Sequence, residues 1–347
     1  MINIPYNDTL AENHWNSKIK DRLVYRIKKV LRQGGVNSGK YKVRTQCRIF
    51  LNYLIKEDPA KLGDYPNLKE LVISHPNRLR EIIIEYKNDY PNLFIGSKNQ
   101  TWSSFKRIIY NIFVDSCYEL DKFFSKDEFI SNIGIGTCSY CNRGYIYSVH
   151  SHSGDVKPQI DHFYPKSIYP FLGISYYNLI PSCSVCNGFG AKEENNPLNF
   201  IGKDAHGHLL YEELLKSPYE LGLDDIKFTF KLLSPNLFGN FIKINIETPS
   251  KGYNRFLKLK QFYNGHTDHV EELIFKSKIK YPKSYRSSIE NLFIAKGDPI
   301  NTSFFYRILI NNYILKDELH KRPLSKLYRD IALQLKLVTE KEITESR

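Results

Sequence analysis

Four cysteines in two Cys-x-x-Cys pairs are the residues of this chain best suited to bind a metal ion. The first pair is Cys138 and Cys141, and the second pair is Cys183 and Cys186. Thiolates with this spacing are the ligands of closed tetrahedral zinc sites. We therefore predict a structural Zn²⁺ on all four thiolates, and we expect the local core to unfold without it. The alternative is that the four cysteines are free thiols.

Polar residues that could carry out hydrolysis lie between and just after the two pairs. Asp161 and His162 are adjacent, Asn178 follows them, and Asn187 stands directly after Cys186. An imidazole beside a carboxylate can serve as a general base next to a metal ligand. Phosphodiester hydrolysis develops negative charge on the phosphoryl and leaving oxygens, and a cation facing a poised imidazole meets both needs. The structural alternatives are a satisfied histidine, a turn carboxylate, a turn amide and a helix cap.

The composition favours a globular protein with an anionic partner. The chain has 347 residues, of which 41% are hydrophobic, so it can bury a sizeable core. Its 50 Lys and Arg residues exceed its 37 Asp and Glu residues, for a formal charge of +13. Such a charge attracts anions over long range, and nucleic acid is the leading partner. Since no apolar run could span a membrane and the first residues lack the order of a secretion signal, we expect a cytoplasmic protein with no membrane partner.

A basic amphipathic helix is predicted near the N-terminus, over Trp15 to Arg32. Apolar residues recur there every three or four positions, Lys and Arg stand between them, and Gly34-Gly35 ends the helix. One interpretation of this charge is the solvated face of a helix that packs on the core. The other is contact with nucleic-acid phosphates, in which Lys28, Lys29 and Arg32 would take part.

The rest of the chain indicates an α+β protein that is mainly helical. The first 125 or so residues carry helical periodicity throughout. In the middle, Tyr145 to Val149, a turn-rich segment and the run that ends at His162 predict a β-hairpin. Beyond it, a strand pair is predicted over residues 226–232 and 241–246. Helices are then expected over residues 255–263, 269–277, 284–294, 303–315 and 324–337.

Three runs of residues carry a family resemblance. They are Ile160-Asp-His-Phe-Tyr-Pro-Lys-Ser167, Tyr177-Asn-Leu-Ile-Pro-Ser-Cys183 and Cys186-Asn187. Together they resemble HNH endonucleases of the ββα-metal fold, in the subtype held by two Cys-x-x-Cys pairs. The resemblance implies a mainly helical chain with a small zinc-bound ββα-metal core in its middle. Its regions would be a helical N-terminal region (1–127), the nuclease core (128–200) and a mixed, mainly helical C-terminal region (201–347).

The resemblance also implies a role for each polar residue. His162 matches the general base that activates water, and Asn178 matches the central Asn that ties the loop and orients that base. Asp161 and Asn187 match the ligands of the catalytic ion, and their hard oxygen atoms suit Mg²⁺ or Mn²⁺ better than zinc. Lys166 and Lys192 are candidate nucleic-acid contacts, and for Lys192 a solvated side chain is the favoured interpretation.

A wider resemblance adds a biological setting. The run from Cys138 to Tyr145, the Asp-His run and a C-terminal run from His320 to Lys326 are similar to HNH proteins that accompany an ATPase in bacterial anti-phage systems of the Septu type. It implies prokaryotic defence with a partner ATPase and invading nucleic acid as the target, and we expect a metal-dependent endonuclease that acts on DNA. The alternatives are an RNA endonuclease, for example on tRNA, and a zinc-ribbon module that binds nucleic acid or a partner without cutting. A plain zinc ribbon has no use for Asp161 and His162.

Overall fold

The chain folds into helices and small two-stranded sheets. The computed structural model describes residues 2–96, 101–149, 151–153, 157–188, 191–192, 194–200, 202–203, 209–210, 214–233, 242–250, 252–280, 284–285, 287–288, 291 and 302–344. No helix among these residues is long and apolar enough to cross a membrane.

The N-terminal third is helical apart from one short hairpin. Its elements are α1 (Asp8–His14), the π-helix η1 (Trp15–Ile19), α2 (Lys20–Gln33), β1 (Gly35–Val36), β2 (Tyr41–Lys42), α3 (Thr45–Leu54), α4 (Pro66–Ile73), α5 (Pro76–Asp89), η2 (Pro91–Phe94), α6 (Ser104–Tyr110), the π-helix η3 (Asn111–Tyr118) and α7 (Lys126–Ile133). The predicted helical character is confirmed, and the antiparallel pair β1–β2 is the exception.

Strands and short helices alternate in the middle of the chain, and helices return after it. The middle contains β3 (Gln159–His162), η4 (Pro170–Leu172), η5 (Tyr176–Asn178), β4 (Leu179–Ser182), α8 (Ser184–Asn187), η6 (Pro197–Phe200), β5 (Gly202–Lys203) and β6 (Leu209–Leu210). The last part contains β7 (Lys227–Leu232), β8 (Ile242–Glu247), α9 (Gly252–Leu257), α10 (Leu259–Tyr263), α11 (Thr267–Phe275), η8 (Lys276–Lys280), α13 (Thr302–Ile310), η9 (Lys316–Lys321), α14 (Ser325–Gln334) and α15 (Glu340–Thr344).

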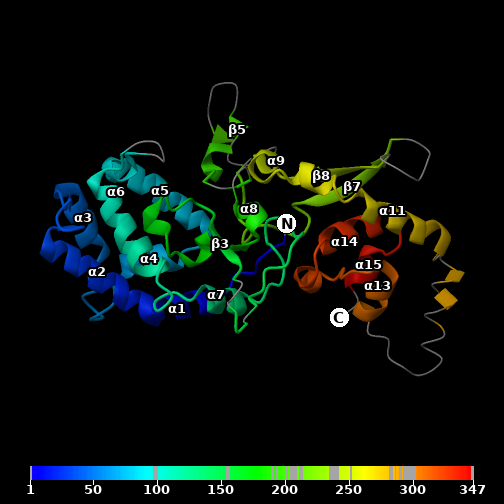
Figure 1. The fold of residues 1–347 in the computed structure, drawn as a ribbon, viewed down its shortest axis with the longest axis horizontal. Coiled ribbons are helices and arrows are strands. Elements are labelled where there is room, and N and C mark those ends of the chain that lie inside the picture. The colour runs from blue at the N-terminus through cyan, green and yellow to red at the C-terminus, as the bar shows by residue number, and fades with distance from the viewer. Residues whose placement is uncertain are drawn as a thin grey trace.

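The molecule is elongated in Figure 1. Helices α2 to α6 form one end, and β7, β8 and the C-terminal helices form the other. Elements β3 and α8 lie between these two ends. The central strands are thus placed where both helical parts can contact them.

Helix α2 follows from the predicted amphipathic pattern, but it begins later than predicted. Its buried residues are Leu23, Val24, Ile27 and Val30. The backbone of Ser17 has a ψ of −164°, which is not helical and separates α2 from the preceding helical turns. The helix ends at Gly34, whose φ of 69° is a left-handed conformation that glycine adopts without steric penalty.

The strand that pairs with β3 differs from the prediction, which placed Tyr145 to Val149 there; part of the turn between the two runs lies outside the described residues. Strand β3 pairs antiparallel with β4, and Asp161 lies opposite Ile180 in this pair. Tyr145 instead forms an isolated bridge with Thr137. The physical reason is burial: all four residues of β4 are buried in the core, whereas Tyr145, Tyr147 and Val149 remain exposed.

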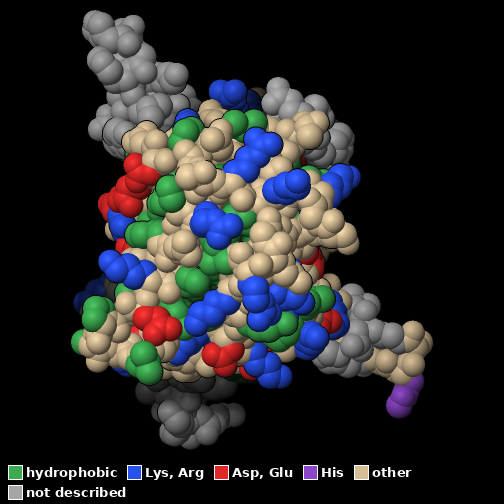
Figure 2. All heavy atoms as spheres, turned by 90° about the vertical axis from the view of Figure 1, so that its left-hand side faces the viewer, with side chains coloured by type: hydrophobic (Ala, Val, Ile, Leu, Met, Phe, Trp, Pro, Cys, Tyr) green, Lys and Arg blue, Asp and Glu red, His purple; other side chains and the backbone are tan. Residues whose placement is uncertain are grey.

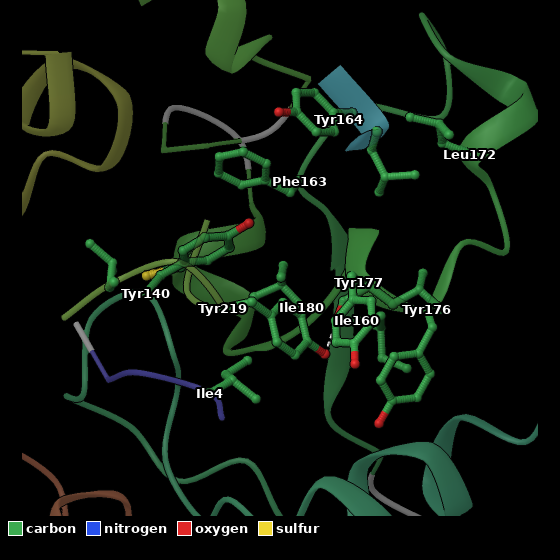
Figure 3. Packing of buried hydrophobic residues seen from close by; sticks show 14 of the residues in the cluster. Ile4, Tyr140, Ile160, Phe163, Tyr164, Leu172, Tyr176, Tyr177, Ile180 and Tyr219 are labelled. Carbon is green, nitrogen blue, oxygen red and sulfur yellow. Dashed lines mark hydrogen bonds between the residues drawn. The ribbon is translucent and has the colours of Figure 1, made fainter. Parts of the chain in front are cut away.

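An aromatic core surrounds the central strands. Figure 3 shows Ile160 of β3 and Ile180 of β4 among Tyr176, Tyr177 and Tyr219. The rings of Tyr177 and Tyr219 meet edge to face, with centroids 5.0 Å apart. The hydroxyl group of Tyr219 donates to the Leu179 carbonyl oxygen at 3.2 Å. Residues between and after the two strands therefore hold them in place.

Most of the C-terminal predictions are confirmed. Strands β7 and β8 form the predicted antiparallel pair. The helix predicted over residues 255–263 is divided into α9 and α10 at Lys258, whose φ is 53°. Helices α11, α13 and α14 occupy the predicted segments. The helix predicted over residues 284–294 lies largely outside the described residues.

Candidate metal centre and adjoining polar site

The four predicted zinc ligands come together in the structure. One ligand atom from each of Cys138, Cys141, Cys183 and Cys186 lies within 4.8 Å of the others. The Sγ atoms of Cys141 and Cys183 are 3.9 Å apart, and none of the four forms a disulfide. A Zn–S bond of about 2.3 Å places tetrahedral sulfur ligands about 3.8 Å apart, so the four thiols could bind a metal such as zinc.

Backbone hydrogen bonds shape the loop that carries the first cysteine pair. The N–H of Cys138 donates to the Gly144 carbonyl oxygen at 2.9 Å, and the N–H of Asn142 donates to the Cys138 carbonyl oxygen. The N–H of Arg143 donates to Sγ of Cys141 at 3.3 Å. A backbone donor to sulfur stabilises a thiolate, which is the form that binds a metal.

The C-terminal region anchors this loop through Asn142. Its buried side chain donates to the Leu319 carbonyl oxygen at 3.2 Å and accepts from Oγ of Ser325 and from the N–H of Lys326, each at 3.1 Å. The hydroxyl group of Tyr263 donates to the Cys141 carbonyl oxygen. The cysteine run and the C-terminal run that share the wider resemblance are therefore in direct contact.

Asp161 is buried and both of its carboxylate oxygens accept hydrogen bonds. Nζ of Lys192 lies 2.8 Å from Oδ1, and the hydroxyl group of Tyr140 donates to Oδ2 at 2.6 Å. The Asp161 side chain is 4% exposed and that of Lys192 is 1% exposed. Lys192 is thus a buried ion-pair partner. The prediction of a solvated lysine is wrong because the Lys192 side chain points inward, to the Asp161 carboxylate on β3.

His162 is also buried, with 5% of its surface exposed, and its ring is oriented by a backbone carbonyl. Its Nε2 atom lies 3.0 Å from the Gly173 carbonyl oxygen. Burial, with a smaller contribution from the charge of Lys166, holds the pKa of His162 well below its ordinary value. The imidazole is therefore neutral at pH 7. A neutral ring that bonds a carbonyl oxygen must donate from that nitrogen, so Nδ1 carries the lone pair.

The lowered pKa of His162 predicts a loss of stability in mild acid. The unfolded chain binds a proton near pH 6.5 and the folded chain does not, so the stabilisation is present above that pH and is lost as the pH falls below it. We expect the wild-type unfolding free energy to fall by up to about 1.4 kcal/mol per pH unit more than that of His162→Gln. Urea unfolding between pH 7.5 and pH 5.5 measures this. Equal pH slopes for the two proteins would contradict it.

Asn178 holds the loop that carries the Gly173 carbonyl. Its Oδ1 atom accepts from the N–H of Tyr164 at 2.7 Å, and its Nδ2 atom donates to the Tyr164 and Leu172 carbonyl oxygens at 3.1 Å. Asn178 thus joins Tyr164 and Leu172, which precede Gly173 in the chain, to the end of the same loop. Gly173 itself has no room for a side chain, because a Cβ atom there would lie 2.6 Å from Cγ2 of Val114.

Asn187 does not converge on Asp161 in this structure. It is the last residue of α8, and its Nδ2 atom donates to Oε1 of Gln159 at 2.9 Å. Gln159 and Asp161 stand two positions apart on β3 and therefore share one face of the strand. The predicted ion ligands Asp161 and Asn187 therefore lie on one side of β3. Each of them is hydrogen-bonded to other protein side chains.

The predicted nucleic-acid contacts have different surroundings. Lys166 forms an ion pair with Glu119, and Lys28 contacts Glu57 and the Tyr65 hydroxyl group. Lys29 lies over the ring of Tyr25, and Arg32 is exposed. Lys192 is buried as described above.

Two residues of the polar site were not anticipated from the sequence. Tyr140 and Gly173 contact Asp161 and His162 respectively, across 21 and 11 positions of the chain. A signal existed for Tyr140, since it lies inside the first cysteine pair. None existed for Gly173, because it contributes only a backbone carbonyl. Comparison with protein-family models, with curated proteins and with solved structures found no match to this chain.

Proposed function

We propose that this chain is an HNH-type endonuclease that hydrolyses phosphodiester bonds of DNA. The observation that carries the proposal is the environment of His162. This neutral imidazole donates Nε2–H to a backbone carbonyl and keeps Nδ1 as a proton acceptor. The order of β3, β4 and α8 around the four thiols is consistent with a zinc-bound ββα-metal core.

In the proposed reaction His162 removes a proton from a water molecule. The water oxygen forms a bond to phosphorus, the bond from phosphorus to the leaving oxygen breaks, and the leaving oxygen takes up a proton from solvent water. Lys126 and Lys166 lie near His162 and both pair with Glu119, so two ammonium groups share one carboxylate and leave a net positive charge that favours an anionic substrate. Nζ atoms of Lys126 and Lys166 each lie 4.7 Å from the centre of the Tyr118 ring, which contacts the His162 ring at 4.5 Å.

The resemblance implies Mg²⁺ or Mn²⁺ on Asp161 and Asn187, and the described contacts do not fit such an ion as they stand. Both oxygens of Asp161 accept hydrogen bonds, and the Asn187 amide faces Gln159. The proposed reaction therefore depends only on His162 and on the lysines near it. The ion, when bound, would stabilise negative charge on the phosphoryl group.

A cleavage assay tests the proposal. The zinc-loaded protein is incubated with plasmid DNA, single-stranded DNA and tRNA, with Mg²⁺, Mn²⁺ or EDTA, alone and with any co-encoded ATPase. We expect plasmid cleavage that requires a divalent ion. Cleavage of tRNA alone would favour the RNA alternative, and cleavage only with the ATPase would support the partner implied by the wider resemblance. A protein that cuts none of these under any condition would contradict the proposal.

A second candidate function is a zinc module that binds nucleic acid or a partner without cutting it. The observation that favours it is the burial of Asp161, His162 and Lys192, which leaves little of the polar site accessible to a substrate. This candidate predicts nucleic-acid binding that is the same in wild-type protein and in His162→Ala, and no cleavage by either.

A basic surface at the helical end of the molecule is the proposed contact for the nucleic-acid backbone. We define it as Arg32, Lys40, Lys42, Arg44 and Arg48, which lie at the end of α2, on the β1–β2 hairpin and at the start of α3. All five are exposed, and within the described part of the chain none has a carboxylate partner. Figure 2 shows Lys and Arg side chains spread over this end of the molecule. Unpaired cations of this kind can release counterions from a phosphate backbone.

The salt dependence of binding distinguishes this surface from general positive charge. Lys42→Gln or Arg44→Gln is expected to lower the slope of log affinity on log salt by about 0.9 for duplex DNA, because one phosphate contact is lost. Lys28→Gln is the matched control, since Lys28 already lies 3.7 Å from Glu57. Fluorescence anisotropy at several salt concentrations gives the slopes. The surface assignment fails if the control lowers the slope as much as the two variants do.

A further inference from the structure

Asp161 is paired with a cation that belongs to the protein itself. Nζ of Lys192 contacts Oδ1 of Asp161 at 2.8 Å and also the His162 carbonyl oxygen. A carboxylate oxygen and a backbone carbonyl oxygen are the hard donors that a magnesium or manganese ion would use. The ammonium group therefore occupies two oxygen donors that a hard cation could also use.

We propose that Lys192 is the resident cation of the Asp161 site and that a divalent ion binds Asp161 only when Lys192 has left it. This inference rests on the proposed function and adds a form of control to it. In the closed arrangement Asp161 is neutralised, and Asp161, His162 and Lys192 are all buried. A divalent ion on the same carboxylate would lie a few ångströms from the ammonium, where two positive charges repel strongly in a site with little water.

The backbone holds Lys192 in this position from both sides. Its N–H donates to the Cys186 carbonyl oxygen at 3.1 Å, and its own carbonyl oxygen accepts from the N–H of Asn195 at 2.8 Å. Cys186 of the second cysteine pair thus positions the Lys192 backbone. Only the Lys192 side chain has to rotate to free Asp161. Tyr140 need not move, because its neutral hydroxyl group contacts the other carboxylate oxygen.

Divalent-ion binding by lysine variants tests the competition. Binding of Mn²⁺ to the zinc-loaded full chain is measured from the electron paramagnetic resonance signal of free Mn²⁺, with zinc content checked before and after. Lys192→Met, which removes the charge and keeps the length, is expected to bind Mn²⁺ at least about tenfold more tightly than wild type. The added Asp161→Asn change should abolish that gain. Equal affinity of wild type and Lys192→Met would overturn the proposal.

A second buried lysine provides the control. Lys326 contacts both oxygens of Asp330 at 2.6 Å, and these two side chains are 1% and 2% exposed, as closely buried as Lys192 and Asp161. Arg329 also contacts Asp330 at 3.4 Å, so Lys326→Met leaves that carboxylate with a cation. We expect Lys326→Met to bind Mn²⁺ like wild type. A gain as large as that of Lys192→Met would also overturn the proposal.

A measurement on the wild-type protein covers the case in which Lys192→Met fails to fold. Amine labelling followed by mass spectrometry reports how accessible each lysine is. Lys192 is expected to be protected without Mn²⁺ and labelled severalfold faster at saturating Mn²⁺, while Lys326 stays protected. Unchanged labelling of Lys192 would overturn the proposal. None of these measurements depends on cleavage, so a failed cleavage assay contradicts the proposed function without deciding the competition at Asp161.

Discussion

Removal of zinc is expected to unfold the centre of this protein rather than to inactivate a folded one. Binding of structural Zn²⁺ to four thiolates contributes on the order of 10 kcal/mol of apparent free energy, which is comparable to the whole stability of a domain. The loss of structure should extend beyond the zinc site, because the loop that carries Cys138 and Cys141 forms hydrogen bonds with distant segments. The Ser139 carbonyl accepts from the N–H of Ile2, and the Asn142 side chain accepts from Ser325 and Lys326 at the start of α14.

The zinc prediction is measured by thermal unfolding and hydrogen exchange, with and without a chelator, and with Cys186→Ser. Cys47→Ala is the matched control, since Cys47 is a buried cysteine outside the four-thiol site. It should cost about 0.5–3 kcal/mol, as an ordinary core change does, and should leave the zinc content unchanged. A chelated protein that unfolds at the same temperature as the untreated protein would show that the four thiols do not carry a structural metal.

Replacement of His162 by alanine is expected to lower the cleavage rate by about 10²–10⁴-fold, the usual contribution of a positioned general base. The effect should fall on kcat, because in the proposed reaction the imidazole accepts a proton and is too buried to hold the nucleic acid. His75→Ala is the control, since His75 is a partly exposed histidine that pairs with Asp8. Equal cleavage by wild type and His162→Ala would remove His162 from the reaction.

The pH profile of cleavage gives a second measure of the same base. Burial lowers the pKa of His162, so the base stays unprotonated as the pH falls from 8 to 6.5. We expect the contribution of the base to the cleavage rate to remain level over that range and to decline only at lower pH. A decline centred near pH 6.5 would instead indicate a solvent-exposed histidine as the base.

Local patterns account for the part of this protein that could be predicted from the sequence. The spacing of Cys138, Cys141, Cys183 and Cys186 predicts a four-thiol site because a Cys-x-x-Cys turn directs two sulfur atoms to one side. The period of the apolar residues predicts α2 and α14 because a helix face repeats every three to four residues. Each of these signals depends on residues that are close together in the chain.

The partner of β3 could not be predicted in the same way. The segment from Tyr145 to Val149 is nearer in the chain and rich in residues that favour strands, yet β4 pairs with β3. The choice depends on which segment can be buried on both faces, and the aromatic residues around Ile160 and Ile180 come from several parts of the chain. Such burial is a property of the packed structure.

The residue types of the candidate site were evident in the sequence, whereas their contacts required the fold. Asp161, His162, Asn178 and Asn187 are visible as a polar group beside the cysteines. The Lys192 ammonium on Asp161, the Tyr140 hydroxyl on the same carboxylate and the Gly173 carbonyl on His162 are not visible. The reason is physical: charge and protonation in a buried site depend on which distant groups replace water there, and only the tertiary structure brings those groups together.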